Sequence, residues 1–147
     1  MSRLLLVLIG LCFIVNASAQ DIKSPQALAA AVATAITTGK AQSLAVLISP
    51  KTRADTKRLV IQDFMVYSGA EHFTVKFLKP NDKAWGGLPL TELLKKQAER
   101  GYAFPAKPLG RIMVSGKRPG NKGISKVGAF YGKFGKNYLL MFATRKK

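Results

Sequence analysis

The sequence GAFYGKFGKNYLLMFAT, residues 128–144, decides the predicted fold because it reads as two strands joined by a tight turn. Its Gly135-Lys136 pair suits a two-residue type II′ hairpin, which favours glycine at the first central position. The resulting register gives four cross-strand pairs, two on each face: Tyr131–Leu140 and Ala129–Phe142, then Phe130–Met141 and Gly132–Leu139. Both faces are apolar at the centre, so we expect both to be covered.

Two glycines within the first of these strands, Gly128 and Gly132, lie four residues apart and therefore on the same face. Glycine inside a strand often marks a bend or a bulge. The hairpin therefore predicts a strongly curved antiparallel sheet.

The remaining strands are predicted from alternation. In residues 72–79, Phe73, Val75 and Phe77 share one face and polar side chains occupy the other, which is typical of a half-buried strand. Residues 111–115, 125–134 and 137–146 are predicted as the closing strands. Residues 59–67 are ambiguous: their β-branched and aromatic residues favour a strand, whereas Gln62-Asp63 in the middle allows a bent strand or a short helix.

Helices are predicted ahead of the sheet. Ser24-Pro25 supplies an N-cap and a first helical residue, and Gly39 a stop. A second, shorter helix is expected over residues 41–48, a loop or single turn over 51–58, and a further helix over 90–100. Residues 20–147 thus form one α+β domain, with N-terminal helices packed on a strongly curved antiparallel sheet.

Three segments carry a family resemblance: the leading helices to Ile48, the sequence SPKTRADTK at residues 49–57, and the closing strands 111–143. In this order the chain resembles the nuclear transport factor 2-like (cystatin-like cone) superfamily, whose N-terminal helices pack into the concave side of a bent sheet. The resemblance implies a pocket there, which in enzymatic members often holds an Asp–His pair or a Tyr. The candidates in this sequence are Asp63, Tyr67, Glu71 and His72.

The first residues predict export. A short positive start, an apolar run over residues 4–15 and the small-x-small ending Ala17-Ser18-Ala19 form a signal peptide over residues 1–19. Twelve apolar residues are fewer than the roughly 20 that span a bilayer. The single cysteine, Cys12, leaves with the signal, so no disulfide is expected. We expect a periplasmic or secreted protein.

The charge is concentrated at the end of the chain. Residues 100–147 contain twelve Lys or Arg and no Asp or Glu, within a full chain of formal charge +17. Such a surface attracts an anionic polymer, a membrane surface or an acidic protein. Export argues against nucleic acid as the partner.

The glycine-rich loop GKRPGNKG, residues 116–123, lacks the order of a nucleotide-binding loop. It can still hold an anion through Lys117, Arg118 and Lys122, helped by Lys133 and Lys136 of the hairpin; the alternative is a solvated hairpin loop. One histidine, no mature cysteine and scattered carboxylates predict no metal site, and no cofactor is expected.

The sequence therefore predicts an exported, non-catalytic binding domain for an anionic ligand or an acidic protein. Two alternatives remain: a small enzyme that uses Asp63 or His72 as a base in the cone pocket, and an immunity or inhibitor protein whose basic face plugs the acidic cleft of a secreted enzyme.

Overall fold

The computed structural model describes residues 21–83 and 87–147, so the predicted signal peptide lies outside the described residues. The elements, in chain order, are α1 (Pro25–Thr38), α2 (Ala41–Ala45), α3 (Ala54–Met65), the 3-10 helix η1 (Val66–Gly69), β1 (Phe73–Leu78), α4 (Leu90–Glu99), β2 (Tyr102–Ala103), β3 (Gly110–Lys117), β4 (Ile124–Phe134), β5 (Asn137–Met141) and β6 (Thr144–Arg145). The predicted α+β class is confirmed; the strong curvature of the sheet stays a prediction.

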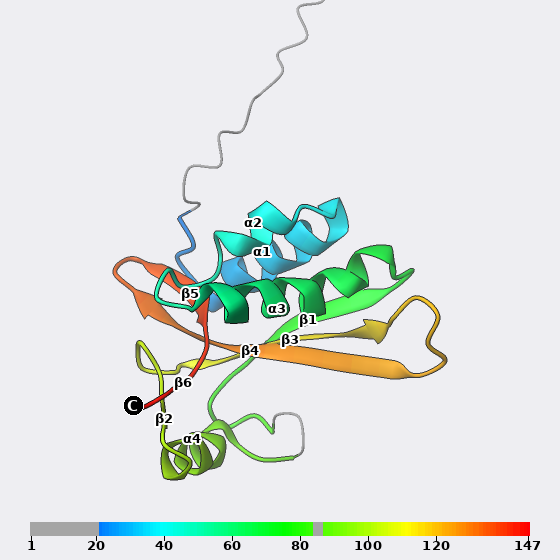
Figure 1. Ribbon diagram of the computed structural model, residues 1–147. Coiled ribbons are helices and arrows are strands. Elements are labelled where there is room, and N and C mark those ends of the chain that lie inside the picture. Colours follow the sequence, from blue (N-terminus) through cyan, green and yellow to red (C-terminus); the bar gives the residue numbers. More distant parts are fainter. Residues whose placement is uncertain (1–20, 84–86) are drawn as a thin grey trace, which may run out of the picture.

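The described elements form layers around one antiparallel sheet, whose strand order is β1-β3-β4-β5. Helices α1, α2 and α3 lie over one face, which we call the inner face (Figure 1). The other face, the outer face, has α4 and the short β2–β6 pair beneath one part of it (Figure 1).

The predicted hairpin register is confirmed over most of its length. Tyr131 pairs with Leu140, and the neighbouring pairs are as expected: Phe130–Met141 and Gly132–Leu139. Gly135 has a φ of 60° and no described residue other than glycine has a positive φ, which is the φ pattern of a type II′ turn.

The prediction of one last strand over residues 137–146, with Ala129 opposite Phe142, is wrong. Strand β5 ends at Met141, and the chain then forms β6, which pairs with β2 in a second, two-stranded sheet. The backbone N–H of Lys146 donates to the carbonyl of Gly101 at 2.7 Å, which extends this pairing. The last residues thus take their partners from residues 101–103, which lie about forty positions earlier in the chain.

The hydrophobic core lies between the inner face and the helices. Strands β3, β4 and β5 contribute Ile112, Val114, Ala129, Tyr131 and Leu140. Helix α1 adds Leu28, Val32 and Ile36, and α3 adds Phe64. The start of α1 is fixed as predicted, since the Ser24 hydroxyl accepts from the Ala27 N–H at 3.0 Å.

Helix α3 takes in residues 54–58 of the predicted loop or single turn and most of the ambiguous segment 59–67, whose last two residues begin η1. Val60, Ile61, Phe64 and Met65 pack into the core at helical spacing, and Gln62-Asp63 falls on the exposed face between them. The helical spacing of the apolar residues therefore outweighs their β-propensity in this segment, because the helix buries its apolar stripe against the sheet.

Aromatic and cationic side chains pack together over one part of the outer face. The ring of Phe104 meets that of Phe130 edge to face at 4.9 Å, and the Arg111 guanidinium lies 5.0 Å from the Phe130 centroid. Burial lowers the pKa of Arg111. A Cβ at Gly128 would collide with the Met113 sulfur and lie 3.2 Å from Arg111 Nη2. The side chains of Met113 and Arg111 therefore occupy the space that a side chain at position 128 would need.

Gly110 provides a sharp stability test because a Cβ there would collide with the Leu78 carbonyl and lie 2.6 Å from Tyr131 Oη. The Gly110→Ala variant is expected to lose about 1–3 kcal/mol of unfolding free energy through overpacking. Gly123→Ala is the matched control, since a Cβ at Gly123 meets nothing within 4 Å. Urea denaturation measures both, and equal stability of the two variants would contradict the packing.

Candidate functional site

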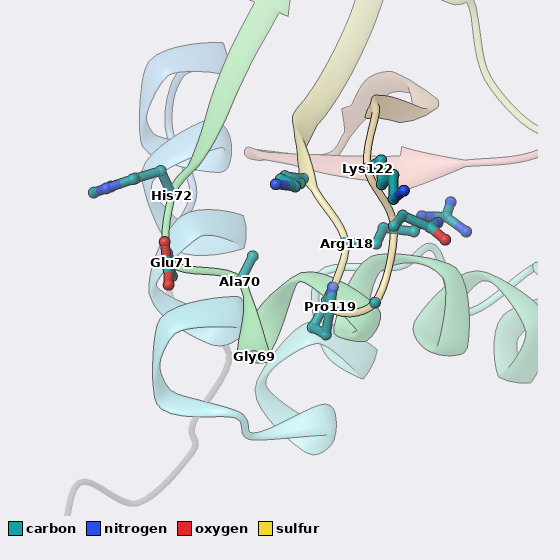
Figure 2. A pocket seen from close by; sticks show the side chains of 10 residues that line it. Gly69, Ala70, Glu71, His72, Arg118, Pro119 and Lys122 are labelled. Atoms are coloured by element: carbon teal, nitrogen blue, oxygen red, sulfur yellow. The ribbon is translucent and has the colours of Figure 1, made fainter.

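The candidate site is a groove between the β3–β4 loop and the segment that joins η1 to β1. Its volume is 540 Å³ and it is open to solvent; residues 69–72 form one wall and residues 117–122 the other. Figure 2 shows the two walls and the basic side chains of the loop. We call this the loop groove. It brings together Lys117, Arg118 and Lys122, three of the five predicted anion-binding residues.

The loop wall is a tight turn rather than an open backbone cradle. The Asn121 N–H donates to the Arg118 carbonyl at 3.0 Å, and Gly120 has a φ of 79°. Proline at the second position and a positive-φ glycine at the third are typical of a type II turn. Pro119 has no N–H and that of Asn121 is already used, so neither residue offers a backbone donor to a ligand in this groove.

A buried tyrosine anchors the loop to the helical layer. Tyr67, on η1, is fully buried, and its hydroxyl lies 2.8 Å from Ser125 Oγ at the start of β4. The Arg118 guanidinium lies 5.6 Å from the centre of the Tyr67 ring, and its Nε is buried with no protein partner. The Arg118 charge is therefore held in place at the base of the loop, which reduces the side-chain entropy lost when it meets an anion.

The charges of the groove are unbalanced. Among the described residues, Lys117, Arg118 and Lys122 form no ion pair; those present join Lys23 to Asp21, Arg53 to Asp55 and Lys96 to Glu92. Glu71 is the one carboxylate that lines the groove. Lys117 and Lys122 are exposed, so both are free to meet a ligand.

The structure does not bring the hairpin lysines to this site. Lys133 and Lys136 lie at the β4–β5 turn, and the β3–β4 loop lies at the other end of β4 (Figure 1). A strand of 11 residues spans about 35 Å. The Lys133 ammonium instead lies 5.9 Å from the Tyr138 ring centre. The five predicted anion-binding residues therefore form two separate groups.

The candidate pocket residues are dispersed as well. Asp63 is exposed on α3, Tyr67 is buried in the core, and His72 is exposed at the start of β1. Of the four candidates, Glu71 and His72 line the loop groove, and Figure 2 shows the His72 side chain directed away from the loop. No acid–base pair forms among them within the described residues, since neither Asp63 nor His72 has a side-chain hydrogen bond or ion pair there.

A second cationic groove, which sequence reasoning missed, lies where the chain end passes the start of α3. Its volume is 710 Å³, and Arg53, Thr56, Tyr102 and residues 143–147 line it. We call it the terminal groove. The basic run at 145–147 was visible in the sequence, but Arg53 lies more than ninety residues earlier. The fold brings Arg53 to the chain end, which the β2–β6 pairing holds beside residues 102–103.

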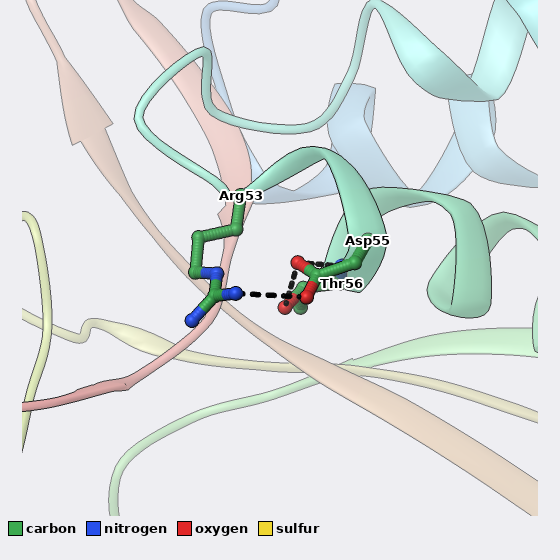
Figure 3. A network of polar contacts seen from close by, with 3 residues as sticks. All are labelled: Arg53, Asp55 and Thr56. Carbon is green, nitrogen blue, oxygen red and sulfur yellow. Dashed lines mark hydrogen bonds and ion pairs between the residues drawn. The ribbon is translucent and has the colours of Figure 1, made fainter.

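One cation of the terminal groove is already engaged. Asp55 Oδ1 accepts from the Thr56 backbone N–H at 2.7 Å, and Oδ2 accepts from Arg53 Nη2 at 3.0 Å (Figure 3). The Thr56 hydrogen bond lowers the pKa of Asp55 against the opposing effect of desolvation, and the charge of Arg53 lowers it further. This carboxylate stabilises the fold above its unfolded pKa, and the contribution is lost as the pH falls through the lower, folded pKa.

Within residues 21–83 and 87–147, no group of three His, Cys, Asp or Glu side chains is placed to hold a metal ion. No helix in the same part of the chain is long and apolar enough to cross a membrane. Comparisons with protein-family models, curated proteins and solved structures gave no match.

The Tyr67–Ser125 hydrogen bond gives an asymmetric pair of variants. Tyr67→Phe removes the hydroxyl and leaves Ser125 its contact with the Gly116 carbonyl at 3.4 Å, so the expected loss is about 1 kcal/mol. Ser125→Ala leaves the buried Tyr67 hydroxyl without a partner and is expected to cost more, about 1–3 kcal/mol. Urea denaturation ranks the two, and a larger loss for Tyr67→Phe would show that the bond is not formed as described.

The Asp55 contacts predict a carboxyl that titrates below its usual value of 3.8. NMR titration of the side-chain carboxyl measures it directly. Arg53→Ala is expected to raise this pKa part of the way, because the Thr56 hydrogen bond remains. Lys133→Ala, at the far hairpin, serves as the charge-matched control and is expected to leave the pKa unchanged. An Asp55 pKa at or above 3.8 in the parent protein would rule out both contacts in solution.

Proposed function

We propose that the protein is an exported, non-catalytic binding domain that holds an anionic ligand at the loop groove. The observation that carries this proposal is the convergence of Lys117, Arg118 and Lys122, without ion-pair partners among the described residues, on a groove of 540 Å³. Phosphate, sulfate and carboxylate groups are the complementary chemistry for such a set.

The anchoring of the loop supports binding over a merely solvated hairpin loop. Arg118 is packed over Tyr67, and Gly69 lies so close to Pro119 that an added Cβ would be 3.3 Å from Pro119 Cγ. Because the loop is held at both Arg118 and Pro119, it presents its lysines at defined positions. A binding partner then meets a preorganised surface.

Catalysis has weaker support. Proton transfer in a cone pocket needs a carboxylate and an imidazole in a shared, partly buried environment. Asp63 and His72 are both exposed, and His72 is directed away from the loop (Figure 2). An immunity or inhibitor role rests on the same cations as the anion-binding proposal and has no separate observation in its favour.

The proposal keeps two expectations from the sequence. Export rests on the signal-like residues 1–19. The resemblance to the nuclear transport factor 2-like superfamily rests on element order alone, with leading helices ahead of an antiparallel sheet, and folds of that superfamily serve many unrelated functions.

The test compares two double variants that remove the same charge from opposite ends of β4. Lys117→Ala with Lys122→Ala is expected to weaken binding to soluble heparin by up to about thirtyfold, because exposed ion pairs are worth up to roughly 1 kcal/mol each. Lys133→Ala with Lys136→Ala is the control and is expected to weaken binding much less.

Fluorescence anisotropy with labelled heparin gives both dissociation constants. Binding is expected to weaken as salt rises, because charges are screened beyond about 8 Å at physiological ionic strength. An equal loss in the two double variants would mean that overall charge, not the loop groove, captures the anion. No binding by the parent protein at low salt would reject the proposed function.

A further inference from the structure

The part of the outer face that carries β1 and the loop-proximal halves of β3 and β4 is exposed. Strand register places three rows of residues across it: His72–Lys117–Ile124, Thr74–Ser115–Lys126 and Lys76–Met113–Gly128. We call these rows the open basic face. Lys76, Lys117 and Lys126 are exposed, and no carboxylate stands in any row. Helix α4 lies towards the other end of the sheet (Figure 1).

An aliphatic side chain stands at the corner of this face. Ile124 is 78% exposed, more than the other exposed large hydrophobic residues of the described chain. The second of these, Leu59 at 56%, lies on α3 in the opposite layer. Ile124 also borders a hollow of 310 Å³ that reaches across to Thr74 and Ser115. The open basic face therefore combines spread lysines with one projecting apolar group.

This combination separates a lipid surface from a soluble polyanion. A polymer of sulfates or phosphates can bind the lysines, but it offers no apolar phase that Ile124 could enter. A bilayer interface can bind both groups, since headgroup phosphates contact the lysines while the aliphatic side chain enters the boundary of the acyl chains. We propose that the open basic face docks on an anionic lipid surface, with Ile124 as the apolar anchor.

This inference rests on the proposed function through Lys117, which lines both the loop groove and the open basic face. It adds the source of the anionic group, the phosphate of a lipid headgroup. It also adds the orientation, with the outer face of the sheet towards the membrane and α1, α2 and α3 away from it (Figure 1).

The experiment measures how much of the protein, as residues 20–147, co-sediments with vesicles. The vesicles consist of phosphatidylcholine alone or of phosphatidylcholine mixed with phosphatidylglycerol. Binding is expected only with the anionic lipid. Ile124→Ser is expected to weaken vesicle binding by about tenfold or more, because it removes the aliphatic carbons that enter the interface. Leu59→Ser, an exposed aliphatic residue on the opposite layer, is the matched control and is expected to leave binding unchanged.

The lysines are tested in the same way. Lys76→Ala with Lys126→Ala is expected to weaken vesicle binding roughly 25-fold, at about fivefold for each lysine near an anionic surface. Lys133→Ala with Lys136→Ala is the charge-matched control at the distant hairpin. Thermal unfolding of every variant identifies any that lose the fold, and for such a position Ile124→Val and Lys→Gln replacements provide the milder comparison.

Heparin binding, measured in parallel, separates this inference from the proposed function. Retained heparin binding with lost vesicle binding in Ile124→Ser supports lipid docking. A parent protein that binds heparin but not anionic vesicles overturns the docking and leaves the loop groove intact. An Ile124→Ser variant that loses heparin and vesicle binding equally also overturns it, since the face would then bind polyanions in general. Binding to neither ligand rejects both proposals.

Discussion

Burial of the inner face of the sheet is the constraint on which the rest of the structure depends. Residues 20–147 contain no cysteine, and the described residues hold no metal cluster, so apolar burial must outweigh the conformational entropy lost on folding. Tyr131, Ile112 and Leu140 lie at its centre and are covered by α1 and α3. The far edge of β5 is also occupied, since Leu140 exchanges hydrogen bonds of 2.8 Å with the backbone of Leu47 and Ser49. The inner face and the free edge of β5 are therefore not open to a partner.

The sequence was sufficient where local chemistry and burial agree. The Ser24 cap, the Gly39 stop and the Gly135 turn each depend on near neighbours, and all three are in place. The class and most of the hairpin register followed from the same kind of signal. Prediction was ambiguous or wrong where a distant partner decides. Helix α3 overrides its β-branched residues because Phe64 and its neighbours face the sheet, and β6 leaves β4 because β2 is available to it.

The candidate site shows the same limit. Composition identified Lys117, Arg118 and Lys122, and their closeness in sequence was enough to place them together. The addition of Lys133 and Lys136 treated a hairpin and a loop as one surface, although the length of β4 separates them. The terminal groove was missed for the converse reason: Arg53 is remote in sequence from residues 145–147 and meets them only through tertiary structure. A count of charges locates a cationic region but cannot give its geometry.

The separation of the two groups of cations bears on what kind of partner the chain suits. The ends of β4 lie about 35 Å apart, several times the roughly 8 Å over which exposed charges act at physiological ionic strength. The loop groove and the hairpin therefore neither repel each other strongly nor act together on a small anion. A flat surface can meet the lysines of the open basic face at once, because Lys76, Lys117 and Lys126 belong to three adjacent strands of one sheet. The sheet thus does more than support the core: its pairing register fixes the spacing of the charges on its other side.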